Sequence, residues 1–155
     1  MALFLSTYLN KIDRKGRVSV PAPYRKTLED GQYKALVALQ SPVLNAIECM
    51  APDRIELYAA SLDKLAKFST QEIDLSVAVF SSAIELTWDN EGRIILPEEM
   101  LAHAGITEQA MFAGGGQTFQ IWEPAAFKTR KAEARERARA GLLTLDLKTG
   151  GGGAS

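Results

Sequence analysis

A short phrase occurs twice in this chain, and an internal repeat restricts the possible folds more than any other feature of the sequence. The phrase Asp13-Arg-Lys-Gly-Arg-Val-Ser-Val-Pro21 returns further along as Asp89-Asn-Glu-Gly-Arg-Ile-Ile-Leu-Pro97. Each copy follows a stretch in which polar and apolar residues alternate, and this pattern predicts a β-strand. Two copies are too few for a solenoid, which needs about three repeats to bury a continuous core. We therefore expect one domain with pseudo-two-fold symmetry, or two small halves that share a core.

The similarity extends beyond the phrase to whole repeat units. Ile47-Glu-Cys-Met-Ala-Pro52 in the first half corresponds to Phe119-Gln-Ile-Trp-Glu-Pro124 in the second, and a helix-like stretch follows each proline. The sequence thus predicts two β-β-α-β-β units, which we call the first and second repeats. The expected ranges are 4–52 for the first repeat, 53–82 for a helical connection, 83–123 for the second repeat, 124–147 for a basic helix and extension, and 148–155 for a disordered glycine-rich tail.

Apolar spacing, prolines and glycines predict the same order of elements in both repeats. The expected strands are 5–12, 17–20, 33–39, 45–50, 83–88, 93–96, 110–113 and 118–122. The expected helices are 22–29, 53–68, 97–103 and 124 to about 140. Residues 70–82 fit either a helix or a strand, and we favour a helix because its length returns the chain to the second repeat. Gly16 is expected to form a tight hairpin turn between strands 5–12 and 17–20.

Length and composition indicate a globular protein without a membrane partner. A chain of 155 residues with 46% hydrophobic content can bury a core, and no apolar run approaches the roughly 18 residues of a membrane helix. The first residues lack the pattern of a secretory signal. Cys49 is the single cysteine, which excludes an internal disulfide and suits a reducing compartment. We expect a cytoplasmic protein.

Little in the sequence points to catalysis. His103 is the single histidine, and no group of histidine, cysteine or carboxylate residues has metal-ligand spacing. Nucleophile and nucleotide-binding motifs are absent from the sequence. The triple glycine 114–116 is not followed by a helix, so a hairpin tip is its simpler interpretation. We expect no enzyme activity, no catalytic residue, no metal and no cofactor, and no small-molecule ligand is evident.

The charges are unevenly distributed although the net charge is only −1. Residues 11–26 hold six basic side chains against one acid, and residues 128–139 hold six against two, whereas residues 27–127 hold five basic and fifteen acidic side chains. A basic patch on an acidic body can still attract phosphate, because local fields govern anion binding at a surface. Solvated charged faces are the alternative interpretation.

The repeated phrase itself has two interpretations. In the structural one, Asp13 and Asp89 cap their turns, Gly16 and Gly92 form them, and each arginine pairs with its aspartate. In the functional one, a rigid turn presents cations to DNA. Arginine can bridge guanine O6 and N7 with two parallel hydrogen bonds. The candidate DNA-binding residues are Lys11, Arg14, Lys15, Arg17 and Arg93.

These residues also resemble a known family. An Asp-x-x-Gly-Arg phrase followed by an apolar-x-apolar-Pro triplet resembles the hairpin of the swapped-hairpin, AbrB-like DNA-binding fold. Two copies, with Phe4 and Tyr8 before the first and Gly114-Gly-Gly to Trp122 near the end, are similar to the MraZ transcriptional regulators. The resemblance covers about residues 4–127. It implies an α+β fold of two pseudo-symmetric swapped-hairpin units that form a small double-psi-like β core with peripheral helices.

The resemblance also implies a function. MraZ-like proteins are cytoplasmic, nucleoid-associated repressors that bind short repeated G-rich boxes in double-stranded promoter DNA. They control the cell division and cell wall gene cluster, including their own promoter, and they assemble into rings that are commonly octameric or larger. The family's motif arginine corresponds to Arg17 and Arg93, and its motif aspartate to Asp13 and Asp89.

The chain departs from the family pattern at several places. Ser6 stands where a glycine is usual, and Asn10 where a histidine is usual. In the second turn, Asn90 and Glu91 replace the basic pair of the first turn, and Glu91 would repel phosphate. We therefore expect the first turn to read DNA and the second mainly to fix the fold or a subunit contact.

Two further alternatives remain open at this point. The helix from 124 onward can be a solvated helix with pairs such as Glu133–Arg137, a subunit contact or a DNA contact. A protein-interaction module similar to an antitoxin, on the same hairpin fold, is the alternative function. Such modules usually carry a single hairpin unit and an acidic tail, whereas this chain has two units and a basic helix.

Overall fold

The computed structural model describes residues 3–141, which form a mixed α and β protein with antiparallel strands. The tail expected at 148–155 and the part of the extension from 142 onward lie outside these residues. The strands are β1 Thr7–Lys11, β2 Arg17–Ser19, β3 Ala35–Gln40, β4 Ile47–Met50, β5 Ile84–Thr87, β6 Arg93–Ile95, β7 Gln109–Gly114 and β8 Phe119–Trp122. The helices are α1 Ala22–Asp30, α2 Ile55–Leu62, α3 Thr70–Leu75, α4 Glu98–Ala104 and α5 Pro124–Arg139, with a 3-10 turn η1 Pro52–Arg54 and a π-helical turn η2 Ser76–Phe80.

The expected elements are therefore confirmed in kind and order, with one difference in extent. The helix expected at 53–68 ends at Leu62, and Phe68 has a positive φ of 62°, which a right-handed helix does not allow. The ambiguous stretch 70–82 is helical, as α3 and η2.

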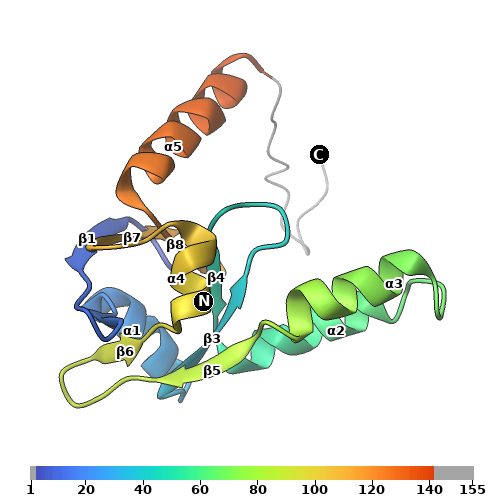
Figure 1. The fold of residues 1–155 in the computed structure, drawn as a ribbon, viewed down its shortest axis with the longest axis horizontal. Coiled ribbons are helices and arrows are strands. Elements are labelled where there is room, and N and C mark those ends of the chain that lie inside the picture. Colours follow the sequence, from blue (N-terminus) through green and yellow to red (C-terminus); the bar gives the residue numbers. More distant parts are fainter. Residues whose placement is uncertain (1–2, 142–155) are drawn as a thin grey trace, which may run out of the picture. The chain divides into compact units, whose positions relative to one another are not determined.

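Six strands form one antiparallel sheet in the order β1-β7-β8-β4-β3-β5, whereas β2 and β6 form a separate two-stranded ribbon (Figure 1). The first strand of each repeat pairs with the third strand of the other. Tyr8 of β1 lies opposite Phe112 of β7, and Leu86 of β5 lies opposite Leu36 of β3. Neither repeat can complete its part of the sheet alone.

This exchange corrects one expectation about pairing. Strands 5–12 and 17–20 do not pair along their length as a simple hairpin would, and only the bridge between Ile12 and Val18 joins them. Instead, β1 pairs with β7 in the six-stranded sheet and β2 pairs with β6 in the separate ribbon, so the two strands belong to different sheets.

The core lies between the inner face of the sheet, the β2/β6 ribbon, α1 and α4. Val18 and Ile94 face each other across the ribbon and are almost fully buried. An aromatic cluster fills the centre. Its members are Phe4, Tyr8, Tyr24, Phe112 and Phe119, with ring centroids 4.7–6.4 Å apart for the contacting pairs.

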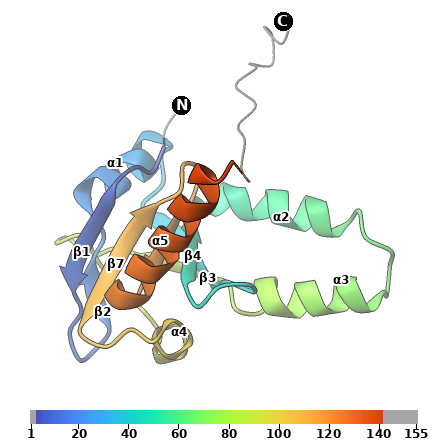
Figure 2. The same cartoon turned by 90° about the horizontal axis from the view of Figure 1, so that it is seen from above.

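Helices α2 and α3 form an arm that extends away from the sheet, as both views show (Figure 2). Its base packs on the outer face of β3 and β4, where Ile55 and Tyr58 contact a small cluster that contains Leu39 and Met50. None of the residues of α2, α3 and η2 is buried, and Phe68 near the tip is 89% exposed.

The chain divides after Pro124 into two compact units. Helix α5 makes up most of the described part of the second unit and contains no buried residue. The expected ion pair between Glu133 and Arg137 is not formed, since these two residues are described and no such contact lies within 4.0 Å. Among residues 3–141, no helix is long and apolar enough to cross a membrane.

Each Asp-x-x-Gly-Arg turn is bonded to the other repeat. The amide of Leu96 donates to the carbonyl of Gly16 at 2.8 Å, and the amide of Val20 donates to the carbonyl of Gly92 at 2.9 Å. Gly16 has a φ of +84°, and a Cβ added to it would lie 2.5 Å from the Leu96 carbonyl oxygen. Glycine is therefore required there both for backbone conformation and for the close approach of the other repeat.

The close approach predicts the effect of Gly16→Ala. A left-handed alanine costs about 1–2 kcal/mol, and the contact with a backbone oxygen adds to it, so we expect a loss of more than about 2 kcal/mol and a melting temperature lower by about 4–8 °C. Gly105→Ala is the matched control, because Gly105 has a φ of +68° but no atom within 4 Å of the added Cβ. Equal losses in the two variants, measured by thermal unfolding, would contradict the role of the close approach.

Ser6 is strained, with a φ of +70°. Its carbonyl accepts hydrogen bonds from the Tyr24 hydroxyl at 2.6 Å and from the Gly114 amide at 2.9 Å, so the backbone is held in this conformation.

Ser6→Gly should raise the free energy of unfolding by about 0.5–1 kcal/mol. Thr7→Gly, one residue further in the regular strand β1, should instead lower it by about the same amount. Denaturant unfolding of both variants tests this, and a destabilised Ser6→Gly variant would refute it.

Candidate nucleic-acid interface

The first turn is organised by the carboxylate of Asp13. Its Oδ1 accepts from the amides of Lys15 and Arg17, both at 2.9 Å, and its Oδ2 accepts from Nε of Arg17 at 2.7 Å. Two backbone bonds complete the turn, from Gly16 to Asp13 at 3.0 Å and from Asp13 to Arg17 at 3.1 Å. The turn is thus rigid, and Arg17 is held by its own aspartate.

The second turn repeats this network. Oδ1 of Asp89 accepts from the amides of Glu91 and Arg93 at 2.9 and 3.0 Å, and Oδ2 accepts from Nε of Arg93 at 3.1 Å. The backbone bonds are present here as well, both at 2.9 Å. The pairing of arginine with aspartate that the structural interpretation expected is therefore present in both turns.

The two arginines differ in what their guanidinium ends contact. Nη2 of Arg93 lies 3.7 Å from a carboxylate oxygen of Glu91. For Arg17, the described residues provide an ion pair through Nε only, and its Nη atoms have no hydrogen-bond partner among them. Both side chains are about one third exposed. Arg17 therefore has two N–H-bearing nitrogens that remain available to a ligand, while Glu91 competes for those of Arg93.

The charges around the two turns also make the first turn more favourable to an anion than the second. Arg14 and Lys15 at the first turn and Lys11 before it are exposed. Residues 13–17 carry a formal charge of +2, whereas residues 89–93 carry −1. The first turn is the more favourable place for a phosphate group.

The β2/β6 ribbon brings the motif arginines onto one surface. Val18 and Ile94 point into the core, so the alternating residues Arg17, Ser19, Arg93 and Ile95 lie on the outer face. Arg17 lies opposite Ile95 and Arg93 opposite Ser19, which places the two turns at opposite ends of the ribbon. The sequence did not predict that the two phrases would pair with each other. Asn10, which departs from the family pattern, donates to the Ser19 carbonyl at 2.8 Å and thereby supports the ribbon.

Arg25 of α1 was not among the candidate residues, and it lies against the second turn. A Cβ added to Gly92 would be 2.6 Å from Cζ and Nε of Arg25, so the guanidinium group sits directly over this glycine. Its Nε also donates to the Val20 carbonyl at 3.1 Å. The basic run 11–26 was the only signal for it in the sequence, because nothing there indicates which turn α1 approaches.

The single histidine and the single cysteine of the sequence have surroundings that suit a role in the fold. His103 is half-buried, and its Nε2 lies 3.1 Å from the Leu44 carbonyl. Cys49 is completely buried, and this burial raises the pKa of its thiol well above the ordinary value. No group of three potential metal ligands occurs within residues 3–141.

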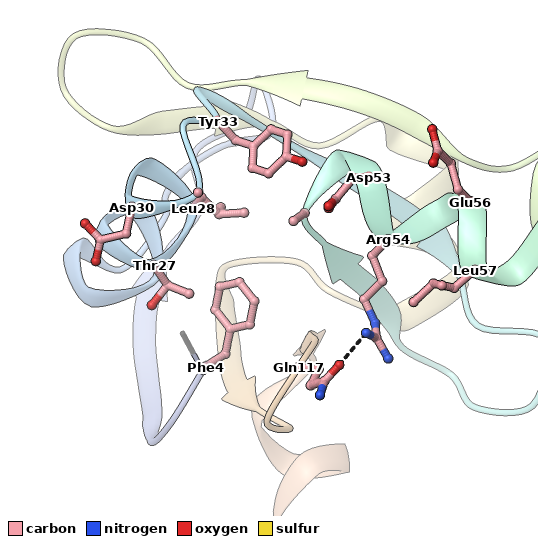
Figure 3. Close-up of a pocket in the computed structure, with 12 residues that line it drawn as sticks. Phe4, Thr27, Leu28, Asp30, Tyr33, Asp53, Arg54, Glu56, Leu57 and Gln117 are labelled. Carbon is pink, nitrogen blue, oxygen red and sulfur yellow. Dashed lines mark hydrogen bonds between the residues drawn. The ribbon is translucent and has the colours of Figure 1, made fainter. Parts of the chain in front are cut away.

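A hollow of about 810 Å³ lies beside α1 and the start of α2 and shares no residue with either turn (Figure 3). Its acidic lining residues are Asp30, Asp53 and Glu56, and Nη1 of Arg54 donates to Gln117 across it. Within the described residues, the buried Nε of Arg54 has no hydrogen-bond partner. Nothing in the sequence indicated this hollow, because its walls come from segments far apart in the chain.

Known proteins resemble the chain over nearly its whole length. A family model described as "MraZ protein, putative antitoxin-like" matches residues 79–144. A "Transcriptional regulator MraZ" of Pelagibacter ubique (strain HTCC1062) is 44% identical over 143 residues, covering 92% of this chain and 92% of that protein. Proteins of the same name from Gluconacetobacter diazotrophicus and Rickettsia rickettsii (strain Sheila Smith) are 41% and 39% identical, covering 98% and 94% of this chain and 98% and 97% of their own lengths.

The turn networks predict a pH dependence of stability. The amide and then the guanidinium of Arg17 lower the pKa of Asp13, and the amide of Arg93 has the largest lowering effect on the pKa of Asp89. Because the folded-state pKa values lie below the unfolded value of about 3.9, both carboxylates stabilise the fold above that pH. This contribution is lost as the pH falls through the folded-state values.

The variant Asp13→Asn/Asp89→Asn should therefore be less stable than the wild type at pH 7, with a difference that shrinks below about pH 4. Urea unfolding between pH 7 and pH 2.5 measures it. Asp74→Asn, at an exposed position of α3, is the control and should change stability by less than about 0.5 kcal/mol. A difference that stays constant over the whole pH range would contradict the role of the two carboxylates.

Proposed function

Because this chain belongs to the MraZ family, whose named relatives are transcriptional regulators, we propose that it is a sequence-specific DNA-binding transcriptional regulator. The observation that carries the proposal is the first turn, in which a rigid loop with a formal charge of +2 presents an arginine with free Nη atoms. The exchanged first strands support an assignment to the AbrB-like swapped-hairpin fold, with two pseudo-symmetric units at 4–52 and 83–123.

Arg17 is the base-reading residue in this proposal. Asp13 binds its Nε and so fixes the direction of the guanidinium, which leaves the Nη groups to donate to guanine O6 and N7. A side chain that is already held loses less conformational entropy when it binds. Lys11, Arg14 and Lys15 supply contacts to phosphate, which position the protein without reading sequence.

The second turn has a smaller part in direct reading. Its network is as complete as that of the first, so it serves the fold, but Glu91 takes up the guanidinium end of Arg93 and repels phosphate. We propose that Arg93 contributes little to affinity.

One arginine–guanine pair discriminates by only about 1–3 kcal/mol. Useful selectivity then requires several chains that engage several sites at once, since a high effective concentration multiplies weak contacts. We propose a homo-oligomeric ring, octameric or larger, that binds short repeated G-rich boxes in promoter DNA. The regulated genes would be the cell division and cell wall cluster, including the protein's own promoter, and the protein would act as a cytoplasmic repressor associated with the nucleoid.

The exposed helix α5 fits a solvated or subunit-packing role in such a ring. The antitoxin-like description of the family model keeps a protein-interaction module as the second candidate. Purification with a bound partner protein, together with no binding to DNA, would favour that candidate.

Fluorescence anisotropy with a duplex of three G-rich repeats and a scrambled duplex tests the proposal. Arg17→Ala should weaken binding to the repeats by about 5- to 150-fold, the range of one bidentate pair, and reduce the preference over the scrambled duplex. Arg93→Ala is the matched control, because it removes the equivalent arginine of the second turn, and it should stay within a few-fold of the wild type.

Equal losses in the two variants would refute the division of roles between the turns. Binding that ignores the sequence of the duplex and disappears with added salt would reduce the first turn to a basic patch.

A further inference from the structure

Arg25 lies at a junction between the two repeats. It belongs to α1 of the first repeat, yet its guanidinium covers Gly92 in the turn of the second. The contact depends on the missing side chain of Gly92, because a Cβ there would lie 2.6 Å from Cζ and 3.0 Å from Nη2 of Arg25. One hydrogen bond, from Nε to the Val20 carbonyl, fixes the orientation of the group, and the amide of Val20 in turn donates to Gly92.

The first turn has no equivalent cation. The residue 76 positions after Arg25 is Leu101, which packs against the core instead. The position over Gly16 is occupied by the backbone of Leu96. The two turns therefore obtain positive charge differently: the first carries Arg14 and Lys15 in its own loop, whereas α1 brings Arg25 to the second.

The Nη atoms of Arg25 remain available. Within residues 3–141 they make no hydrogen bond or ion pair, and the residue is only half-buried. With Arg25, the formal charge around the second turn rises from −1 to zero. A guanidinium fixed through Nε and open at both Nη atoms is suited to a phosphate group, which it can bind with two parallel hydrogen bonds.

We propose that Arg25 binds a DNA phosphate beside the second turn, so that this turn joins the DNA interface through a cation supplied by the other repeat. The inference rests on the proposed function. It also offers a reason why Arg93 can contribute little while the second turn still lies close to DNA: the phosphate contact belongs to Arg25.

The test measures DNA affinity against salt concentration for the wild type and four variants, three of them at Arg25 and one at Lys26. Arg25→Met removes the charge but keeps an unbranched side chain over Gly92, and Arg25→Gln adds an amide that can still donate to Val20. Lys26→Met is the matched control, because it removes the same charge from the next residue of α1, where Lys26 faces Asp30 at 3.4 Å. Circular dichroism melting checks that each variant is folded.

Log affinity falls as log salt concentration rises, and the loss of one phosphate contact makes this fall less steep by about 0.9. Both proteins bind more tightly as the salt concentration falls, but for each tenfold decrease the variant gains about eight-fold less affinity than the wild type. We expect this change for both neutral Arg25 variants on the G-rich and the scrambled duplex alike, and less than half of it for Lys26→Met. Arg25→Lys should restore the slope.

Several outcomes overturn the inference. One is a salt slope in both neutral variants that equals the wild-type slope. Another is an equal change of slope in Arg25→Met and Lys26→Met, because the charge of Arg25 would then act on DNA only at long range and not through a phosphate contact. If the salt slope of Arg25→Lys is reduced as much as that of the neutral variants, Arg25 would serve to position the turn and not to bind phosphate. If the wild type itself does not bind DNA, the proposed function fails, a result distinct from the failure of Arg25 alone.

Discussion

The exchange of first strands between the repeats is the constraint on which the rest of the structure depends. Strand β1 completes the sheet of the second repeat, and β5 completes that of the first, so neither repeat has a closed core without the other. While β1 pairs with β7 in the six-stranded sheet, β2 pairs with β6 in the separate ribbon. That pairing buries Val18 against Ile94 and brings the two Asp-x-x-Gly-Arg turns to one ribbon. The arrangement of the candidate interface is thus a consequence of how the sheet is shared.

The structural and functional interpretations of the repeated phrase are compatible. The aspartate satisfies two backbone amides and one guanidinium nitrogen in each turn, which is a purely local role. The same bond holds the Arg17 guanidinium in one orientation, which under the proposed function prepares it to bind DNA. What distinguishes the two arginines is the residue before the glycine: Lys15 makes no ion pair with Arg17, whereas Glu91 lies 3.7 Å from the guanidinium of Arg93. The residues that the two copies of the phrase share are aspartate, glycine and arginine, and these form the turn. The shared residues alone therefore do not distinguish the proposed role of the first turn from that of the second.

The sequence predicted the elements far better than their partners. Alternation and proline positions located every strand, and helical spacing correctly favoured a helix at 70–82, because these signals are local. The pairing of β1 with β7, by contrast, depends on which edge each strand leaves open, and no local pattern encodes that. The same limit applies to Arg25 and to the hollow beside Arg54. Both arise where segments far apart in the chain meet. The turn residues Asp13, Gly16, Asp89 and Gly92 were predictable because a tight turn selects its residues by backbone conformation.

The size of the ribbon links the two turns energetically. Three residues in each strand span only about 10 Å at 3.3–3.4 Å per residue, which is similar to the width of about 12 Å of the DNA major groove. A duplex that meets the outer face of the ribbon at Arg17 therefore also comes near the second turn. The net charge of −1 on residues 89–93 would oppose binding at that distance, since charges about 10 Å apart are only partly screened at physiological salt. Placement of Arg25 over Gly92 cancels this charge without altering the turn. Under the proposed function, the asymmetry between the repeats gives the two turns different roles: the first turn reads bases, and the second is neutral enough to lie beside the DNA.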